Sequence, residues 1–165
     1  MKNLVLSLLL AIPLLGHAQR EVYPFYYPCQ AEETGEWGYV DKDNNWAIRA
    51  QYSAVLYETN GGMYPVSKNG KWGLVGVSGL PLTDIKFDAV VCEIDYVKHH
   101  YEAYFCAVRL RGKWAFLDVQ GKFVTGFKYD EVLIMNGEYI IRQKTDKGKM
   151  RTGRLDKDGK EIWDN

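Results

Sequence analysis

The chain has no net charge, because its 21 lysine and arginine residues balance 21 aspartate and glutamate residues. It also lacks any long run of basic residues. Nucleic-acid binding depends on neutralising phosphates, and attachment to anionic lipid depends on clustered lysine and arginine. The bulk charge therefore argues against a nucleic-acid partner and against a polybasic membrane attachment.

Short catalytic motifs are also missing. The sequence contains no Gly-x-Ser-x-Gly, no His-Glu-x-x-His and no phosphate-binding glycine loop. His99 and His100 are adjacent, so an extended strand would point them to opposite faces, which suits shared metal binding poorly. With Glu102 they leave a weak zinc or nickel site as an alternative. We expect no catalytic residue, no metal and no cofactor.

The chain has a single long apolar run. Lys2 precedes twelve uncharged residues, 4–15, and Gly16-His17-Ala18 supplies the small residue that signal peptidase needs. Twelve residues are too few to span a bilayer, which takes about twenty. No cysteine follows the cleavage site, which argues against a lipoprotein. We predict a signal peptide over 1–18 and an exported protein, located in the periplasm, at the cell surface or in the medium.

No segment shows a helical apolar period, whereas 12 Tyr, 6 Phe and 5 Trp are many for 165 residues and suit half-buried sheets. One frame recurs three times, with a tryptophan followed fifteen residues later by an aromatic residue and then, after three more, by a valine. These tryptophan–aromatic pairs are the predicted structural core of the repeats: Trp37 and Tyr52, Trp72 and Phe87, Trp114 and Tyr129. A degraded fourth copy begins near Thr152.

Each copy reads as about four short antiparallel strands. The first, such as 37–40, is apolar on both faces, which predicts cover on both sides. A turn ending in Gly or Asn leads to a second strand, such as 122–125. A third strand holds the aromatic residue and its valine, and a fourth, such as 63–67, ends in a turn at 69–70. The expected fold is all-β, an array that is either solenoid-like and curved or propeller-like.

Three segments are expected: the signal peptide, an N-terminal edge segment over 19–35, and the β-repeat domain over 36–165. Residues 22–28 are aromatic and contain prolines. They fit an edge strand laid across the first repeat or, alternatively, an aromatic recognition strip. In the fourth copy Thr152 and Arg154 replace apolar residues, which fits a terminal repeat that no neighbour covers, or plain divergence.

The motifs at 70–73, 37–41 and 112–114 resemble the WG-repeat family, whose units centre on Gly-Lys-Trp-Gly-Tyr-Ile-Asp. The resemblance extends over roughly residues 36–163. It departs at Gly76, Ala115 and Thr152. The resemblance implies a β-rich repeat module, common in exported and envelope-associated bacterial proteins. It implies no catalytic residue and no known ligand.

The spacing from Trp72 to Trp114 is 42 residues, against 35 from Trp37 to Trp72. Aligning the copies places Cys92 on Tyr57 and Cys106 on Tyr64, two expected cross-strand neighbours. In an oxidising compartment this predicts a Cys92–Cys106 disulfide, which leaves Cys29 over. Pairing with Cys29, or three free thiols, are the alternatives.

The insertion between these cysteines carries the predicted binding residues, which offer ring area, hydroxyl groups and charge. They are Tyr96, Lys98, His99, His100, Tyr101, Glu102 and Tyr104. We predict a non-catalytic binding module of the bacterial envelope that recognises an envelope or extracellular protein, or a glycan. A self-assembling structural protein, an inhibitor or immunity-type protein and, last, a small hydrolase are the alternatives.

Overall fold

The computed structural model describes residues 24–57, 62–92, 105–135 and 137–164. Over these ranges it contains thirteen strands and no helix, and every strand pairs antiparallel with its neighbours in four small sheets. The predicted all-β class is confirmed. No described helix is therefore a candidate for crossing a membrane. The predicted signal peptide lies outside the described residues.

Each sheet is a meander of consecutive strands. The first sheet holds β1 (Tyr27–Gln30), β2 (Trp37–Val40) and β3 (Trp46–Tyr52). The second holds β4 (Ala54–Val55), β5 (Tyr64–Lys68) and β6 (Lys71–Val75). The third holds β7 (Ala89–Val91), β8 (Cys106–Leu110) and β9 (Lys113–Leu117). The fourth holds β10 (Glu131–Met135), β11 (Glu138–Lys144), β12 (Met150–Leu155) and β13 (Glu161–Trp163).

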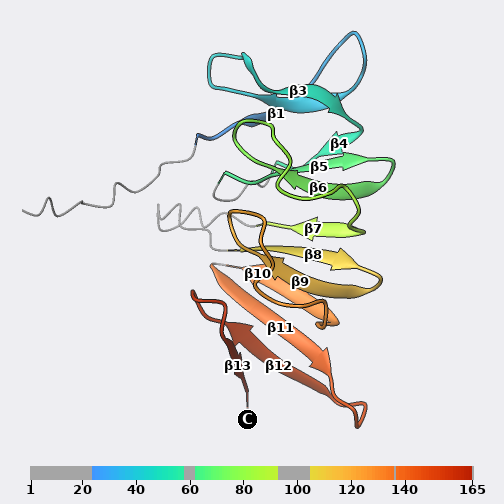
Figure 1. Cartoon of the computed structure of the whole chain (residues 1–165), viewed down its shortest axis with the longest axis vertical. Helices are drawn as coiled ribbons and strands as arrows, with labels where there is room; N and C mark the ends of the chain where they lie inside the picture. The colour runs from blue at the N-terminus through green and yellow to red at the C-terminus, as the bar shows by residue number, and fades with distance from the viewer. Residues whose placement is uncertain (1–23, 58–61, 93–104, 136, 165) are drawn as a thin grey trace, which may run out of the picture.

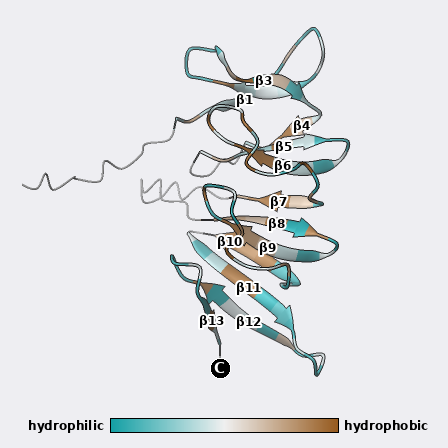
Figure 2. Cartoon of the chain, in the orientation of Figure 1, coloured by the Kyte–Doolittle hydropathy of each residue, from teal (hydrophilic) through white to brown (hydrophobic). Residues whose placement is uncertain are grey.

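The four sheets follow one another in chain order along the longest axis of the molecule, with the first and last at opposite ends (Figure 1). We call this arrangement the column. A separate cluster of buried apolar side chains lies at each of its three sheet-to-sheet interfaces. Hydrophobic stretches lie within β6, β7 and β11, whereas β12 is largely hydrophilic (Figure 2). The column is open, so the first and last sheets do not meet as they would in a ring.

The fifteen-residue spacing reflects cross-strand pairing. Trp37 lies opposite Tyr52 in the ladder between β2 and β3. Isolated bridges join Trp72 to Phe87 and Trp114 to Tyr129 in the same way. Opposite residues in an antiparallel pair share a face and touch. The constant spacing is therefore the length of chain that returns each aromatic residue to the position opposite its tryptophan.

The two faces of a tryptophan strand in the second or third sheet pack against different neighbouring sheets. In β6, Leu74 and Trp72 pack in the cluster that the second sheet shares with the third. Val75 packs in the cluster that the second sheet shares with the first. Phe116 and Leu117 of β9 divide in the same manner, towards the fourth and second sheets respectively. Alternate residues point to opposite faces, so the prediction of cover on both sides is confirmed for β6 and β9. Among the described sheets, only the second packs on β2.

The prediction of a second strand in each copy is wrong for the second and third copies. Residues 122–125 form no strand, and only isolated bridges, Val75 to Pro81 and Leu117 to Phe123, remain there. A threonine explains the difference. Its hydroxyl accepts a hydrogen bond from a main-chain N–H of the tryptophan strand. Thr83 accepts from Leu74 in the second copy, and Thr125 accepts from Phe116 in the third. The first copy has Ile48 at this place, and there β3 continues as a ladder.

The turns into the tryptophan strands have the predicted hairpin geometry. Asn69 and Gly70 both have positive φ, 53° and 72°, and so do Arg111 and Gly112, 52° and 79°. Two successive residues with positive φ match the right-handed twist of the flanking strands. This fixes the register between the fourth strand of one copy and the tryptophan strand of the next. The second, third and fourth sheets therefore each contain strands from two sequence repeats.

The aromatic leading segment supplies β1, which pairs along the whole of β2. This places β1 where β5 and β8 lie in the second and third sheets, next to a tryptophan strand. The first sheet is thus completed by residues that precede the first copy of the repeat.

Candidate binding surface

The predicted binding loop lies outside the described residues, and so do all of its candidate side chains: Tyr96, Lys98, His99, His100, Tyr101, Glu102 and Tyr104. Its two ends are described. Cys92 and Cys106 form a disulfide with a Cα–Cα distance of 4.7 Å, as predicted. Both cysteines are buried, 3% and 0% exposed, in the core between the second and third sheets. The insertion therefore starts and ends at a covalently joined point of the column.

Cys29 is the remaining cysteine and is not disulfide-bonded. It lies on β1 opposite Gly38 and is partly exposed. Among the described residues its sulfur has only a long contact, 3.9 Å, with the main-chain oxygen of Gln30.

An aromatic cluster lies where the leading segment meets the end of β4. The ring of Phe25 packs edge-on against Tyr27, at 5.0 Å, and against Tyr57, at 6.2 Å. Tyr27 and Tyr57 are 42% and 53% exposed, so much of their ring area faces solvent. We call these three residues the aromatic patch. This segment, expected to form either an edge strand or a recognition strip, supplies the edge strand β1 and also carries exposed rings.

The aromatic patch is supported by tyrosines that lie deeper. Tyr26 stacks on Tyr64 at 5.0 Å, and Tyr64 packs edge-on against the buried Tyr39. The Tyr39 hydroxyl is within hydrogen-bond distance of the carbonyl oxygens of Leu56 and Pro65, at 2.7 and 2.8 Å. The Tyr64 hydroxyl donates to the carbonyl of Pro24. Burial, together with neighbouring Tyr26, raises the pKa of Tyr64 well above its usual value, so the phenol stays protonated.

The aromatic patch and the disulfide occupy equivalent places in successive sheets. Tyr64 pairs with Val75 at the start of β5, and Cys106 pairs with Leu117 at the start of β8. The alignment of Tyr57 and Tyr64 with the two cysteines is therefore borne out by the register. Strand ends that occupy equivalent positions lie on the same edge of a stacked array. The inserted loop and the aromatic patch thus emerge from one edge of the column.

Two aspartates repeat a structural contact at the opposite strand ends. Asp88 accepts hydrogen bonds from the Lys71 ammonium, at 2.7 Å, and from the main-chain N–H of Arg111, at 2.8 Å. Asp130 makes the equivalent bonds with Lys113 and the N–H of Lys144. The lysine hydrogen bonds, followed by those main-chain bonds, lower the pKa of both carboxyl groups. Each aspartate therefore joins the motif lysine of its own copy to the hairpin that leads into the next copy.

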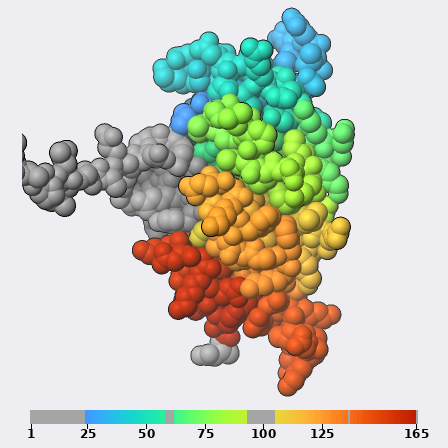
Figure 3. All heavy atoms as spheres, viewed as in Figure 1, coloured from blue at the N-terminus to red at the C-terminus, as the bar shows by residue number. Residues whose placement is uncertain are grey.

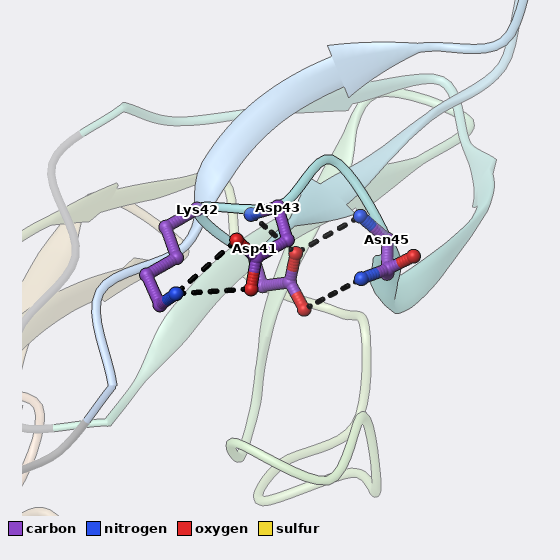
Figure 4. A network of polar contacts seen from close by, with 4 residues as sticks. All are labelled: Asp41, Lys42, Asp43 and Asn45. Carbon is purple, nitrogen blue, oxygen red and sulfur yellow. Dashed lines mark hydrogen bonds and ion pairs between the residues drawn. The ribbon is translucent and has the colours of Figure 1, made fainter.

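The aspartate at the end of the first tryptophan strand closes its own turn. Asp41 accepts hydrogen bonds from the main-chain N–H groups of Asp43 and Asn45, both at 2.9 Å (Figure 4). Asp118 and Asp156 do the same in later copies. In the second copy Gly76 holds the turn through main-chain bonds alone. The carboxylates at this motif position are used as turn acceptors.

Glu161 is the carboxylate with the most contacts near the C-terminal end. It accepts hydrogen bonds from the Tyr129 hydroxyl, at 2.7 Å, and the Trp163 indole, at 3.1 Å, and pairs with Lys128. Burial would raise the pKa of Glu161, but the bonds from Lys128 and Tyr129 outweigh it and hold the pKa low. An ionised carboxylate with three donors is a structural acceptor rather than a general acid.

Metal-binding clusters of three or more His, Cys, Asp or Glu side chains do not occur in the described ranges. The six predicted core residues of the repeats divide by exposure: Tyr52, Phe87 and Tyr129 are buried, whereas the tryptophans are half-buried at the start of their strands. The large apolar side chains that remain exposed collect at the edge and at the two ends of the column.

Sequence reasoning missed one feature of the charge distribution. The hairpin of β11 and β12 carries six basic residues and one acidic residue between Arg142 and Arg154. Its excess is hidden in a chain whose total charge is zero. Counting charge within each hairpin, rather than over the whole chain, would have shown it.

A comparison with protein families gives a match over residues 37–72, to the WG containing repeat. The matched segment runs from the first motif tryptophan to the second, which is one full period of the frame. No curated protein and no solved structure matches the chain. The match confirms the resemblance predicted from the motifs. Residues 37–72 are therefore similar to a WG containing repeat, and this segment folds as short antiparallel strands divided between the first two sheets.

Proposed function

We propose that this protein is a non-catalytic, exported binding module of the bacterial cell envelope that recognises a protein or a glycan. The observation that carries the proposal is the aromatic patch, whose exposed rings share an edge of the column with the disulfide that anchors the inserted loop. The rest of the column serves as the scaffold that holds this edge in place.

Phe25, Tyr27 and Tyr57 have the chemistry of a recognition surface. A tyrosine ring offers apolar area for stacking and a hydroxyl for hydrogen bonding, at the entropic cost of only two side-chain torsions. The buried stack of Tyr26, Tyr64 and Tyr39 fixes the position of the patch. Such preorganisation reduces the ordering cost of binding.

The inserted loop would supply specificity beside this patch. Its tyrosines, its two histidines and its charged residues would contact the parts of the ligand that the aromatic patch does not reach. Placing variable recognition residues on a loop held by a rigid scaffold is common in binding proteins.

The carboxylates support a non-catalytic role. A carboxyl group that serves as a general acid at neutral pH needs a pKa raised towards neutrality. Asp41, Asp88, Asp130 and Glu161 instead have lowered pKa values. Each is used as a hydrogen-bond acceptor within the fold.

The test is retention of envelope components from the producing bacterium on immobilised protein. Two variants are compared with the wild type: Tyr27→Ala/Tyr57→Ala for the patch and His99→Ala/His100→Ala/Tyr101→Ala for the loop. Leu133→Ala is the matched control, because Leu133 is also exposed, 50%, but lies on β10 in the fourth sheet, at the other end of the column from the first.

We expect a protein or glycan to be retained by the wild type and by the control, and lost by the patch and loop variants. The retained component is then purified and its affinity measured directly with the same four proteins. Equal affinity for all four would contradict the proposed site. Export is tested separately, by fractionating cells and sequencing the N-terminus, which should begin near Gln19.

A further inference from the structure

The two ends of the column carry opposite charge on the same edge. The turn between β1 and β2, residues 31–36, contains Glu32, Glu33 and Glu36 and no basic residue. All three glutamates are exposed. The hairpin of β11 and β12 carries the basic excess, with Lys144, Lys147 and Lys149 around its turn. Among the described residues, none of these six side chains belongs to an ion pair.

These two turns are equivalent elements of the array. Each precedes a tryptophan strand or its fourth-copy counterpart, as the turns at 69–70 and 111–112 also do. Figure 1 shows all four turns along one side of the column, with the acidic turn at one extremity and the basic turn at the other. In the space-filling view both project from the body of the molecule (Figure 3).

The end faces between these turns are apolar. On the first sheet a cross-strand row runs from Tyr27 through Val40 to Trp46. Its two aromatic members are each 42% exposed. We call this the head face. No described sheet packs on it.

The outward face of the fourth sheet is the tail face. Its central row runs from Leu133 through Ile140 and Arg154 to Ile162. Met135 and Met150 belong to the same face, because they alternate with residues of the core. Four of the nine exposed large hydrophobic side chains in the described ranges lie on this face: Leu133, Met135, Met150 and Ile162, each between 37% and 50% exposed.

The head face has the residue pattern with which the second and third sheets each pack against the sheet before them. Val40 occupies the strand position of Val75 and Leu117, each of which packs in the core shared with the preceding sheet. On the tail face Arg154 occupies the position of Leu74 and Phe116. A guanidinium can cover aromatic rings. The chain itself does this twice, with Arg151 at 3.7 Å from the Trp163 ring and Arg109 at 5.5 Å from that of Trp114.

We propose that the tail face of one copy of this chain docks on the head face of a second copy, continuing the stacking of sheets from one molecule to the next. Leu133, Ile140 and Ile162 would cover the exposed rings of Tyr27 and Trp46, and Arg154 would lie against these rings. Val40, which lies between them in the row, is only 7% exposed in the single molecule. Continuing the column brings the basic β11–β12 turn next to the acidic β1–β2 turn of the neighbour. An interface between different faces that does not close into a ring gives an open chain of copies.

A membrane of anionic lipid is the main rival occupant for the tail face, because it also attracts exposed apolar and basic side chains. It leaves the acidic turn and the head face without a partner. Docking of further copies gives the head face, the tail face and both charged turns a partner. It also repeats the sheet-on-sheet interface that the molecule already contains three times. The observations therefore favour self-association. Tyr27 belongs both to the head face and to the aromatic patch, so docking of a second copy would cover part of the proposed ligand site.

The test is sedimentation velocity of the protein as cells produce it, over a range of protein and salt concentrations. The tail variant is Lys147→Glu/Lys149→Glu, and the head variant is Glu32→Lys/Glu33→Lys. The control, Lys68→Glu/Lys122→Glu, makes the same charge change on two exposed lysines in the middle of the column. A fourth variant, Trp46→Ser, removes apolar area from the head face.

We expect the mean mass of the wild type to rise with protein concentration and to fall with salt, because screening weakens contacts between exposed charges. Head and tail variants should each dissociate at concentrations about tenfold higher or more. An equimolar mixture of the two should associate again, since the reversed tail matches the reversed head. Trp46→Ser should weaken association, and the control should behave as the wild type.

Recovery in the mixture also establishes that both variants are folded. The proposal is overturned if the wild type sediments as a monomer throughout, if both reversed variants associate like the wild type, or if mixing them restores nothing. It is equally overturned if the monomer binds phosphatidylglycerol-containing vesicles through Lys147 and Lys149 without self-association. That result would assign the tail face to a lipid surface.

Discussion

The hydroxyl of Thr125 lies 2.9 Å from the main-chain nitrogen of Phe116 and accepts its hydrogen bond inside the core. Thr83 and Leu74 repeat this relationship in the preceding copy. The side chain thus replaces the carbonyl that a paired strand would have offered. It also explains why the chain can leave the ladder here without leaving a buried N–H unpaired.

Replacing Thr125 with valine should destabilise the fold by roughly 1–3 kcal/mol, because it leaves the buried N–H of Phe116 without an acceptor. Urea unfolding followed by tryptophan fluorescence measures the change. Thr125→Ser keeps the hydroxyl and is the matched control. A loss of stability for serine with none for valine would show that the methyl group, and not the hydrogen bond, matters.

Removing the disulfide by Cys92→Ser/Cys106→Ser should lower the free energy of unfolding by roughly 3 kcal/mol, since the bond closes a loop of moderate length in the unfolded chain. Cys29→Ser should have a small effect, because Cys29 is partly exposed and unpaired. Alkylation without reductant should label one thiol of the unfolded wild type. Labelling of three thiols in oxidised protein would contradict the bond.

Gly121 should tolerate alanine worse than Gly70 does. Both have positive φ, 76° and 72°, so both pay the left-handed strain of about 1–2 kcal/mol. Only at Gly121 would the added Cβ lie 2.7 Å from the carbonyl oxygen of Leu82, in the preceding copy. Gly70 has no atom within 4 Å of that point. The difference in unfolding free energy between the two variants isolates the contact between copies, and equal values would count against it.

The aspartate–lysine contacts should make the protein less stable in acid. The folded pKa of Asp88 and that of Asp130 lie below the ordinary value of 3.8. A group with a lowered folded pKa contributes stability above its unfolded pKa and loses that contribution as pH falls through the folded pKa. Thermal melts between neutral pH and about pH 2 should show the loss. Asp88→Asn/Asp130→Asn should be less stable at neutral pH and should lose less on acidification; an unchanged pH profile would contradict this.

The architecture was largely predictable because the tryptophan and its aromatic partner keep one spacing in three copies, and cross-strand pairs of this kind identify a hairpin from sequence alone. The Cys92–Cys106 bond followed from the same alignment. The missing strand at 122–125 did not, because Thr125 looks like an ordinary strand residue until its hydroxyl is seen to bond Phe116. The end-to-end separation of charge was also hidden, since it depends on which hairpins lie at the ends of the column.

The candidate site was predicted only in part. The loop residues around His99 lie outside the described ranges, so their role stays a prediction. Phe25 and Tyr57 are far apart in sequence and belong to segments that were read separately. Their contact depends on β1 pairing with β2, which brings the leading segment beside the end of β4.

The three separate core clusters have a consequence for how such a molecule changes length. Because each interface is self-contained, inserting or deleting one period of the frame between two sheets would preserve the packing rules on both sides of the join. Gene duplication could therefore lengthen the protein by whole units without redesigning an existing core, while recognition loops diversify independently along its edge.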